Sequence, residues 1–229
     1  MRAFSLRPDS DRIRPKIFLA TIADARWASV NLDDRARRDF LDRAANPLNR
    51  PDFCAAWVRR VAESLGADFT VGGYGELRTN LWRGHYHNPE TMRHLGIDFN
   101  VPAGTEVYVP ESCEVVRVLR DDSYGGWGGA VFCKLEKPCG TMAYVCFAHL
   151  AHDVLPSAGK KLSFFQKIGR VGLPRENGVW YPHLHVQGYT QEAYDSCGGR
   201  LEELDGYGLN TDDGLELFPD PWPWVLEAA

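Results

Sequence analysis

The sequence predicts an α+β protein that is mainly β, with its helices confined to the N-terminal part. Two stretches before Gly66 carry apolar side chains at helical spacing. From Gly72 onward, glycine-containing turns separate short runs of alternating apolar and polar residues, as in all-β architectures. The 229 residues suffice for one large domain, or for one domain with an added helical part.

The first predicted helix lies in the stretch "NLDDRARRDFLDRAAN". Its apolar residues Leu32, Ala36, Phe40 and Ala44 have helical spacing, acidic residues occupy its first turn, and Pro47 follows its end. These features together predict a helix that ends before Pro47.

The second predicted helix lies in "RPDFCAAWVRRVAESLG", with Pro51 near its start and Gly66 at the place of a C-terminal cap. One stripe of this helix carries apolar side chains and predicts core packing: Phe53, Trp57, Val61 and Leu65.

Seven later runs read as strands, and turns such as "PAGT" and "KPCGT" separate several of them. They are residues 94–101, 105–110, 113–119, 129–136, 142–150, 167–173 and 183–189. The acidic tail ends in "FPDPWPWVLEAA", whose prolines and tryptophans predict an arm packed across the body. We therefore divide the chain into a helical extension (1–71), a β domain (72–198) and a C-terminal arm (199–229).

The overall composition argues against two kinds of partner. The chain is 44% hydrophobic and 25% charged, with a formal net charge of -5 and no run rich in Lys or Arg, so nucleic acid is not an expected partner. No 18-residue apolar run predicts a membrane span. The start, "MRAFSLRPDSDRIRPK", lacks the apolar stretch of a signal peptide, and we expect a cytoplasmic protein. The sequence does not predict an oligomeric state.

Six cysteines occur without a CxxC pair. We expect reduced thiols that are mostly buried. A Cys133–Cys139 disulfide is the alternative if the protein is exported.

Two strands carry residues that could bind a metal. In "RHLGIDFNV", alternation places Leu95, Ile97, Phe99 and Val101 on an apolar face, and His94 and Asp98 on the other. In "WYPHLHVQG", His183 and His185 share a face for the same reason. His149 ends a third, largely apolar strand.

Histidine and aspartate are ordinary zinc ligands, and a catalytic zinc site uses three of them and leaves the fourth position for water. His94, Asp98, His149, His183 and His185 exceed that need, and a hydrolase would use the surplus for proton transfer and oxyanion stabilisation. The alternative is that each histidine pair lies on a solvated face. A second pair, His85 and His87, has the same spacing but sits in loop-like sequence.

Three ordered stretches resemble the lysostaphin/LytM-type zinc metallopeptidase family: "HLGIDFNVPAGTEVYV", "YVCFAHL" and "KIGRVGLPRENGVWYPHLHVQ". The resemblance covers about residues 93 to 188. It implies a compact antiparallel β-sheet core with a groove over one face. It also implies that His94, Asp98 and His185 bind zinc, and that His149 and His183 are the catalytic histidines beside it.

The sequence departs from the family near the HxH motif. Trp180 and Tyr181 stand where the family keeps small residues, and Gln187 replaces a glutamate. We expect Trp180 and Tyr181, with Asn177, to line a modified substrate groove; the alternative is that Trp180 packs inward as core. The acidic pair Glu202–Glu203 reads as solvated surface.

The resemblance implies a zinc-dependent metallohydrolase, an endopeptidase that cleaves amide bonds in a peptide or a peptidoglycan-like substrate. One alternative is a zinc-containing module that binds a peptide or cell-wall fragment without turnover. Another is a carrier domain that uses paired histidines for phosphoryl transfer, although the carboxylate of Asp98 beside the histidines argues against it.

Overall fold

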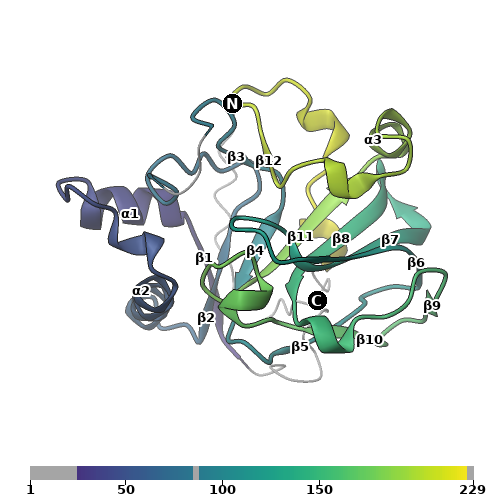
Figure 1. The fold of residues 1–229 in the computed structure, drawn as a ribbon, viewed down its shortest axis with the longest axis horizontal. Coiled ribbons are helices and arrows are strands. Elements are labelled where there is room, and N and C mark those ends of the chain that lie inside the picture. The colour runs from purple at the N-terminus through teal and green to yellow at the C-terminus, as the bar shows by residue number, and fades with distance from the viewer. Residues whose placement is uncertain (1–24, 85–87, 226–229) are drawn as a thin grey trace.

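The computed structural model describes residues 25–84 and 88–225, and its centre is an eight-stranded sheet (Figure 1). The strand order is β1-β2-β4-β11-β8-β7-β6-β9. These strands are β1 (Trp27–Val30), β2 (Phe69–Gly72), β4 (Ile97–Asn100), β6 (Cys113–Asp121), β7 (Gly128–Cys139), β8 (Met142–Leu150), β9 (Lys161–Leu162) and β11 (Leu184–Tyr189). The prediction of a mainly β protein is confirmed.

The predicted antiparallel core is present from β2 to β9, and β1 adds one parallel strand at the edge of the sheet. All its neighbouring strands are antiparallel except β1 and β2, which are parallel. The physical reason is that β1 and β2 are joined by a helical crossover, which returns the chain in the same direction. Residues 1–71 therefore supply two strands that the sequence analysis missed. The division of the chain into three parts remains a prediction.

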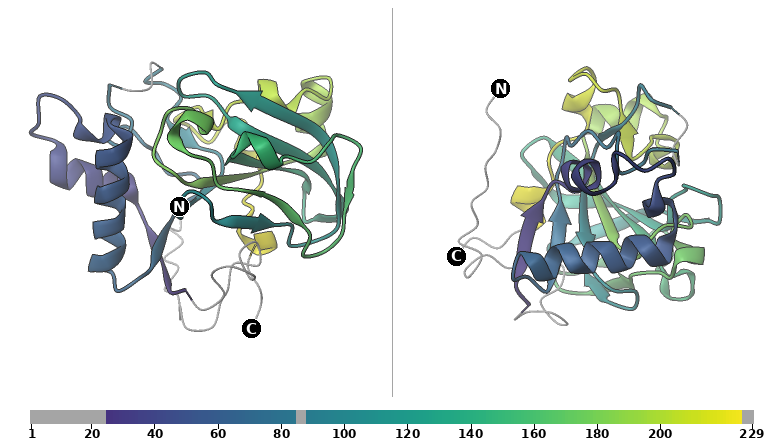
Figure 2. Two further views of the ribbon diagram at one scale, coloured as in Figure 1. Left: turned by 60° about the horizontal axis from the view of Figure 1, so that its bottom comes forward. Right: turned by 90° about the vertical axis from the view of Figure 1, so that its left-hand side faces the viewer.

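Two helices form this crossover, α1 (Leu32–Phe40) and α2 (Pro51–Ser64). The side chain of Asn31 caps α1 by accepting a hydrogen bond from Asp34 N. Pro51 begins α2, and Gly66 follows its end with φ 68°, a conformation that favours glycine. Figures 1 and 2 show both helices beside β1 and β2, at one edge of the sheet.

The predicted stripe of α2 is buried only in part. Trp57 and Val61 pack in a cluster with α1 and with the segment around Trp82, while Leu65 at the last turn is 40% exposed. The expectation for Leu65 was wrong because α2 ends at Ser64, so Leu65 lies beyond the last helical residue.

One face of the main sheet is covered by an apolar core. Ile97, Phe99 and Val101 point into it, as do Leu184 and Val186, which confirms the predicted alternation. The C-terminal helix α4 (Trp222–Val225) adds Trp222 and Trp224 to the same core.

Smaller elements complete the fold. β5 (Glu106–Tyr108) pairs with β10 (Lys167–Arg170), and β3 (Arg93–His94) pairs with β12 (Tyr207–Gly208). The short helix α3 (Gln191–Ser196) follows β11 and packs near β8. Within the described residues, no helix is long and apolar enough to cross a membrane.

All six cysteines are free thiols, and all but Cys139 are buried. The alternative Cys133–Cys139 disulfide is therefore not formed.

Candidate metal centre and its pocket

The centre begins with a cross-strand pair. Asp98 on β4 lies directly opposite His185 on β11 in the antiparallel register, so both side chains leave the same face of the sheet. Asp98 Oδ1 lies 2.9 Å from His185 Nδ1. The two residues that the alternation placed on polar faces therefore meet because their strands are neighbours.

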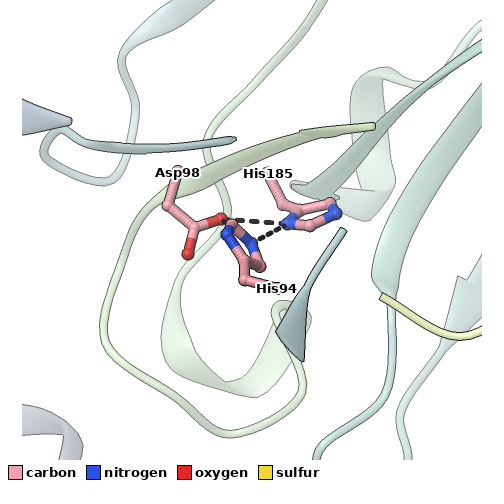
Figure 3. A group of neighbouring side chains, drawn as sticks. All are labelled: His94, Asp98 and His185. Carbon is pink, nitrogen blue, oxygen red and sulfur yellow. Dashed lines mark hydrogen bonds and ion pairs between the residues drawn. The ribbon is translucent and has the colours of Figure 1, made fainter. Parts of the chain in front are cut away.

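His94 reaches the same point from β3. The chain bends at Gly96, so β3 and β4 are separate strands rather than the single strand that the sequence predicted. His94 Nε2 lies 3.0 Å from His185 Nδ1 and 3.3 Å from Asp98 Oδ1 (Figure 3). Ligands of a tetrahedral zinc ion with bonds of about 2.0–2.2 Å are roughly 3.3–3.6 Å apart, so the three donor atoms fit one ion with small adjustments.

Hydrogen bonds fix the protonation of both ligand rings. His94 Nδ1 lies 3.0 Å from the carbonyl oxygen of Gly73, which can only accept, so Nδ1 carries the proton and Nε2 keeps its lone pair. The amide of Gln187 donates through Nε2 to the carbonyl of Asp205, so its Oε1 faces His185 Nε2 at 3.0 Å and accepts from it. In the neutral form of the ring, which is the form that binds a metal, His185 Nδ1 then keeps its lone pair as well.

Three lone-pair atoms therefore face one another: His94 Nε2, His185 Nδ1 and Asp98 Oδ1. Neutral imidazoles and a carboxylate with no shared proton repel at such distances, and a cation between them removes the repulsion. The donor chemistry thus fits a divalent metal, and imidazole with carboxylate is a common zinc ligand set.

Gly96 leaves the space that this arrangement needs. A Cβ added at residue 96 would lie 2.7 Å from His185 Cε1 and 2.8 Å from His185 Nε2. Any side chain here would push the imidazole away from Asp98.

The charge states support the same assignment. Burial, with the nearby Arg78 charge second, lowers the pKa of His94 to about 4, so this ring is neutral at pH 7. Burial opposes the ionisation of Asp98, but the His94 and Arg78 side chains together hold its pKa well below the usual value. A neutral imidazole and an ionised carboxylate are the forms that bind metals.

The two remaining histidines lie beside the ligands. The ring centroids of His149 and His183 are 4.3 Å apart, and His183 Nε2 lies 4.0 Å from Asp98 Oδ1. His183 Nδ1 lies 2.8 Å from the carbonyl oxygen of Tyr181, so Nδ1 carries the proton and Nε2 can accept one. Nδ1 of His149 is buried without a hydrogen-bond partner. Burial lowers the pKa of both rings, so both are neutral.

These side chains open into a pocket of about 210 Å³. Its lining includes Asp98 and the histidines 149, 183 and 185, together with the aromatic residues Trp82, Trp127 and Tyr207. Glu202 also lines it, and the Glu202 side chain is only 12% exposed and pairs with Arg117 at 2.7 Å. The reading of Glu202 as solvated surface was wrong, because the chain after α3 folds back over the site.

The predicted groove residues lie elsewhere. Trp180, Tyr181 and Asn177 are buried, and none of them lines this pocket. Trp180 stacks on Trp82 with ring centroids 4.4 Å apart. Asn177 ties the loop together by donating to the carbonyl of Tyr181 and accepting from Trp180 N. Trp180 and Tyr181 pack in a core cluster, and the expectation that the three residues line a substrate groove stays a prediction.

Tyr181 has a second role in supporting the site. Its ring stacks on that of His183 at 4.9 Å, and its hydroxyl donates to Asn100 Oδ1 at 2.6 Å. The other histidine pair, His85 and His87, lies outside the described residues, so its prediction stays untested.

Sequence reasoning did not predict the aromatic residues that line the pocket or the buried Arg78 that contacts Asp98. Trp82, Trp127 and Tyr207 come from segments far apart in the chain, and none belongs to a metal-ligand pattern. The only local signal was their residue type, which core packing explains equally well.

A buried His–Asp–His donor set with two neutral histidines beside it, at one side of a pocket, is the arrangement of a metal-dependent hydrolase. The model of Peptidase family M23 matches residues 92–195, which hold all five of these residues. This match confirms the resemblance to lysostaphin/LytM-type enzymes over these residues and supports a metallopeptidase in this part of the chain.

Solved structures with a similar part include a zinc-containing peptidase from Vibrio cholerae, at 24% identity and a TM-score of 0.36 over 44% of this chain and 28% of that one. A variant of the catalytic domain of the prophage-encoded M23 protein EnpA from Enterococcus faecalis is 22% identical over 54% of this chain and 82% of that one, with a TM-score of 0.40. The catalytic domain of lysostaphin from Staphylococcus simulans is 21% identical over 72% and 96%, with a TM-score of 0.41. A search of curated proteins found no match.

Proposed function

We propose that this chain is a zinc-dependent endopeptidase that cleaves amide bonds in a peptide or a peptidoglycan-like substrate. The observation that carries the proposal is the convergence of three lone-pair atoms, on His94, Asp98 and His185, whose protonation is fixed by their other hydrogen bonds. A bound zinc ion would act as a Lewis acid toward the scissile carbonyl and would make water more acidic.

We assign the proton acceptor to His183. Its Nδ1–H donates to the carbonyl of Tyr181, so Nε2 faces the centre as a neutral base. The same hydrogen bond stabilises the charged ring after Nε2 has taken a proton from water, because the carbonyl dipole favours the imidazolium.

We assign oxyanion stabilisation to His149. Its ring lines the pocket beside that of His183, and it is neutral with one N–H to donate. A donor held in a buried site can stabilise the negative charge that develops on the carbonyl oxygen.

The test is hydrolysis by the zinc-loaded chain. The purified protein is incubated with peptidoglycan, with glycine-rich peptides and with peptides containing D-amino acids, and new amino groups are measured. Release of amines that stops when a chelator removes the metal supports the proposal. Zinc binding and substrate binding without amine release would instead support the non-catalytic binding module.

A further inference from the structure

A buried arginine stands directly behind the candidate metal centre. Arg78 is 1% exposed, and its Nη1 donates to Asp98 Oδ2. Its Nε and Nη2 each lie 3.3 Å from Glu76 Oε2. Arg78 lies outside residues 92–195, so the match to Peptidase family M23 does not include it.

The arginine divides the two oxygens of Asp98 between two tasks. Oδ2 accepts from the guanidinium, and Oδ1 is left to face His94 and His185. A carboxylate held in this way can offer a metal one oxygen only, at a fixed angle. Groups that orient ligands from behind typically change metal affinity by about 10–100-fold when they are lost.

We propose that Arg78 is a positioning residue that makes Asp98 a one-oxygen ligand, and that the N-terminal segment thereby completes the metal centre. The inference rests on the zinc site of the proposed function.

The surrounding structure holds Arg78 in this place. A Cβ added at Gly72 on β2 would lie 2.7 Å from Arg78 Nη2, so the glycine leaves room for the guanidinium. Glu76, which holds the other side of Arg78, accepts from Asp33 N in the first turn of α1 at 3.3 Å.

The segment that carries Arg78 is hydrogen-bonded to the same turn of α1. The Asp33 carboxylate accepts from Asn80 N at 2.6 Å and from Leu81 N at 2.8 Å. The path from α1 to the metal centre therefore runs through Asp33, Glu76 and Arg78 to Asp98. The crossover between β1 and β2 gives the site a support that residues 92–195 do not contain.

Metal binding tests the proposal. Zinc affinity is measured by competition with a chelator, and cobalt-loaded protein gives a visible spectrum that reports ligand geometry. The main variant is Glu76→Gln with Arg78→Met, which leaves no unpaired carboxylate at residue 76 and leaves Asp98 without its arginine partner. Gly72→Ala is the second variant, since it displaces the guanidinium without removing any charge.

Arg83→Met is the matched control. Arg83 lies in the same segment and donates to the carbonyls of Phe40 and Arg43 at 2.9 and 3.1 Å, away from Asp98. We expect wild-type zinc affinity and cobalt spectrum for this control. The main variant and Gly72→Ala should each bind zinc about 10–100-fold more weakly, with an altered cobalt spectrum.

The outcomes separate the two claims. Folded variants with wild-type affinity and an unchanged cobalt spectrum would overturn the role of Arg78 and leave the zinc site standing. If the main variant does not fold, Gly72→Ala decides alone. If the wild-type chain itself binds no zinc, the proposed function fails, and the role of Arg78 fails with it.

Discussion

Gln187 departs from the family pattern but still accepts the hydrogen bond that orients the ring of His185. The related family has a glutamate at this position, and the structure shows Gln187 Oε1 accepting from His185 Nε2–H. A glutamate oxygen could accept the same hydrogen bond, so the substitution changes the charge behind the ligand but not the ring that it orients. The departure therefore does not argue against metal binding.

The roles of the two other histidines can be separated from those of the ligands. His149→Ala and His183→Ala should each keep zinc and lose about two to four powers of ten in turnover, because each removes a proton acceptor or donor but no ligand. Zinc content and amine release are measured on the same preparations. Loss of zinc from either variant would show that the missing histidine is a ligand, and unchanged turnover in both would place the chemistry elsewhere.

At the scale of single elements, alternation predicted the faces of β4 and β11 but not their contact. Ile97, Phe99, Leu184 and Val186 enter the core as expected, and this fixed the side on which Asp98 and the HxH pair lie. That β4 and β11 are neighbours depends on the order of strands in the sheet, which local periodicity does not contain.

The end of β8 shows a limit of the same reasoning. Strict alternation would send His149 to the core side with Val145 and Phe147. A register irregularity between β7 and β8, together with φ 64° at His149, brings the ring beside His183 instead. Such a backbone conformation is uncommon for a residue other than glycine and is found at functional sites.

The bend between β3 and β4 should be sensitive to one added methyl group. A Cβ at residue 96 would lie 2.5 Å from the carbonyl oxygen of Val186 and 2.7 Å from His185 Cε1, so we expect Gly96→Ala to lower zinc affinity at least ~10-fold and to disturb the sheet locally. Metal titration with circular dichroism measures both. Phe164→Ala is the control, because this exposed side chain does not line the pocket and its loss should leave zinc binding normal. Equal affinity of the Gly96→Ala variant and wild type would contradict the described packing.

The loop before the HxH motif contributes to the free energy of unfolding. Trp180→Ala should lower the free energy of unfolding by about 3–5 kcal/mol, because it opens a cavity beneath the pocket and removes the stack on Trp82. Phe164→Ala is the control, since Phe164 is 61% exposed and should change stability by under about 0.5 kcal/mol. Urea unfolding measures both variants. A Trp180→Ala protein of wild-type stability with altered substrate choice would support the expectation of a groove residue.

At the scale of the whole molecule, local patterns sufficed to predict the β class and the shared faces of Asp98 and the HxH pair. The hydrogen bonds that join α1, the segment around Arg78 and β4 were not predictable, because they connect residues 20 to 48 positions apart in the chain. The two N-terminal strands were missed for a related reason. Each strand has only four residues, and β1 belongs to the sheet only through its pairing with β2, from which the helical crossover separates it in sequence.

The measurement that tests the metal centre most directly is the zinc content of the purified chain and of its Asp98→Ala and His185→Ala variants. Three donors on His94, Asp98 and His185 predict one zinc ion per chain. Either substitution leaves two donors, which hold the ion poorly, so both variants should lose most of their zinc. A wild-type chain without zinc, or variants that keep the full zinc content, would contradict the assignment of these three residues as the ligands.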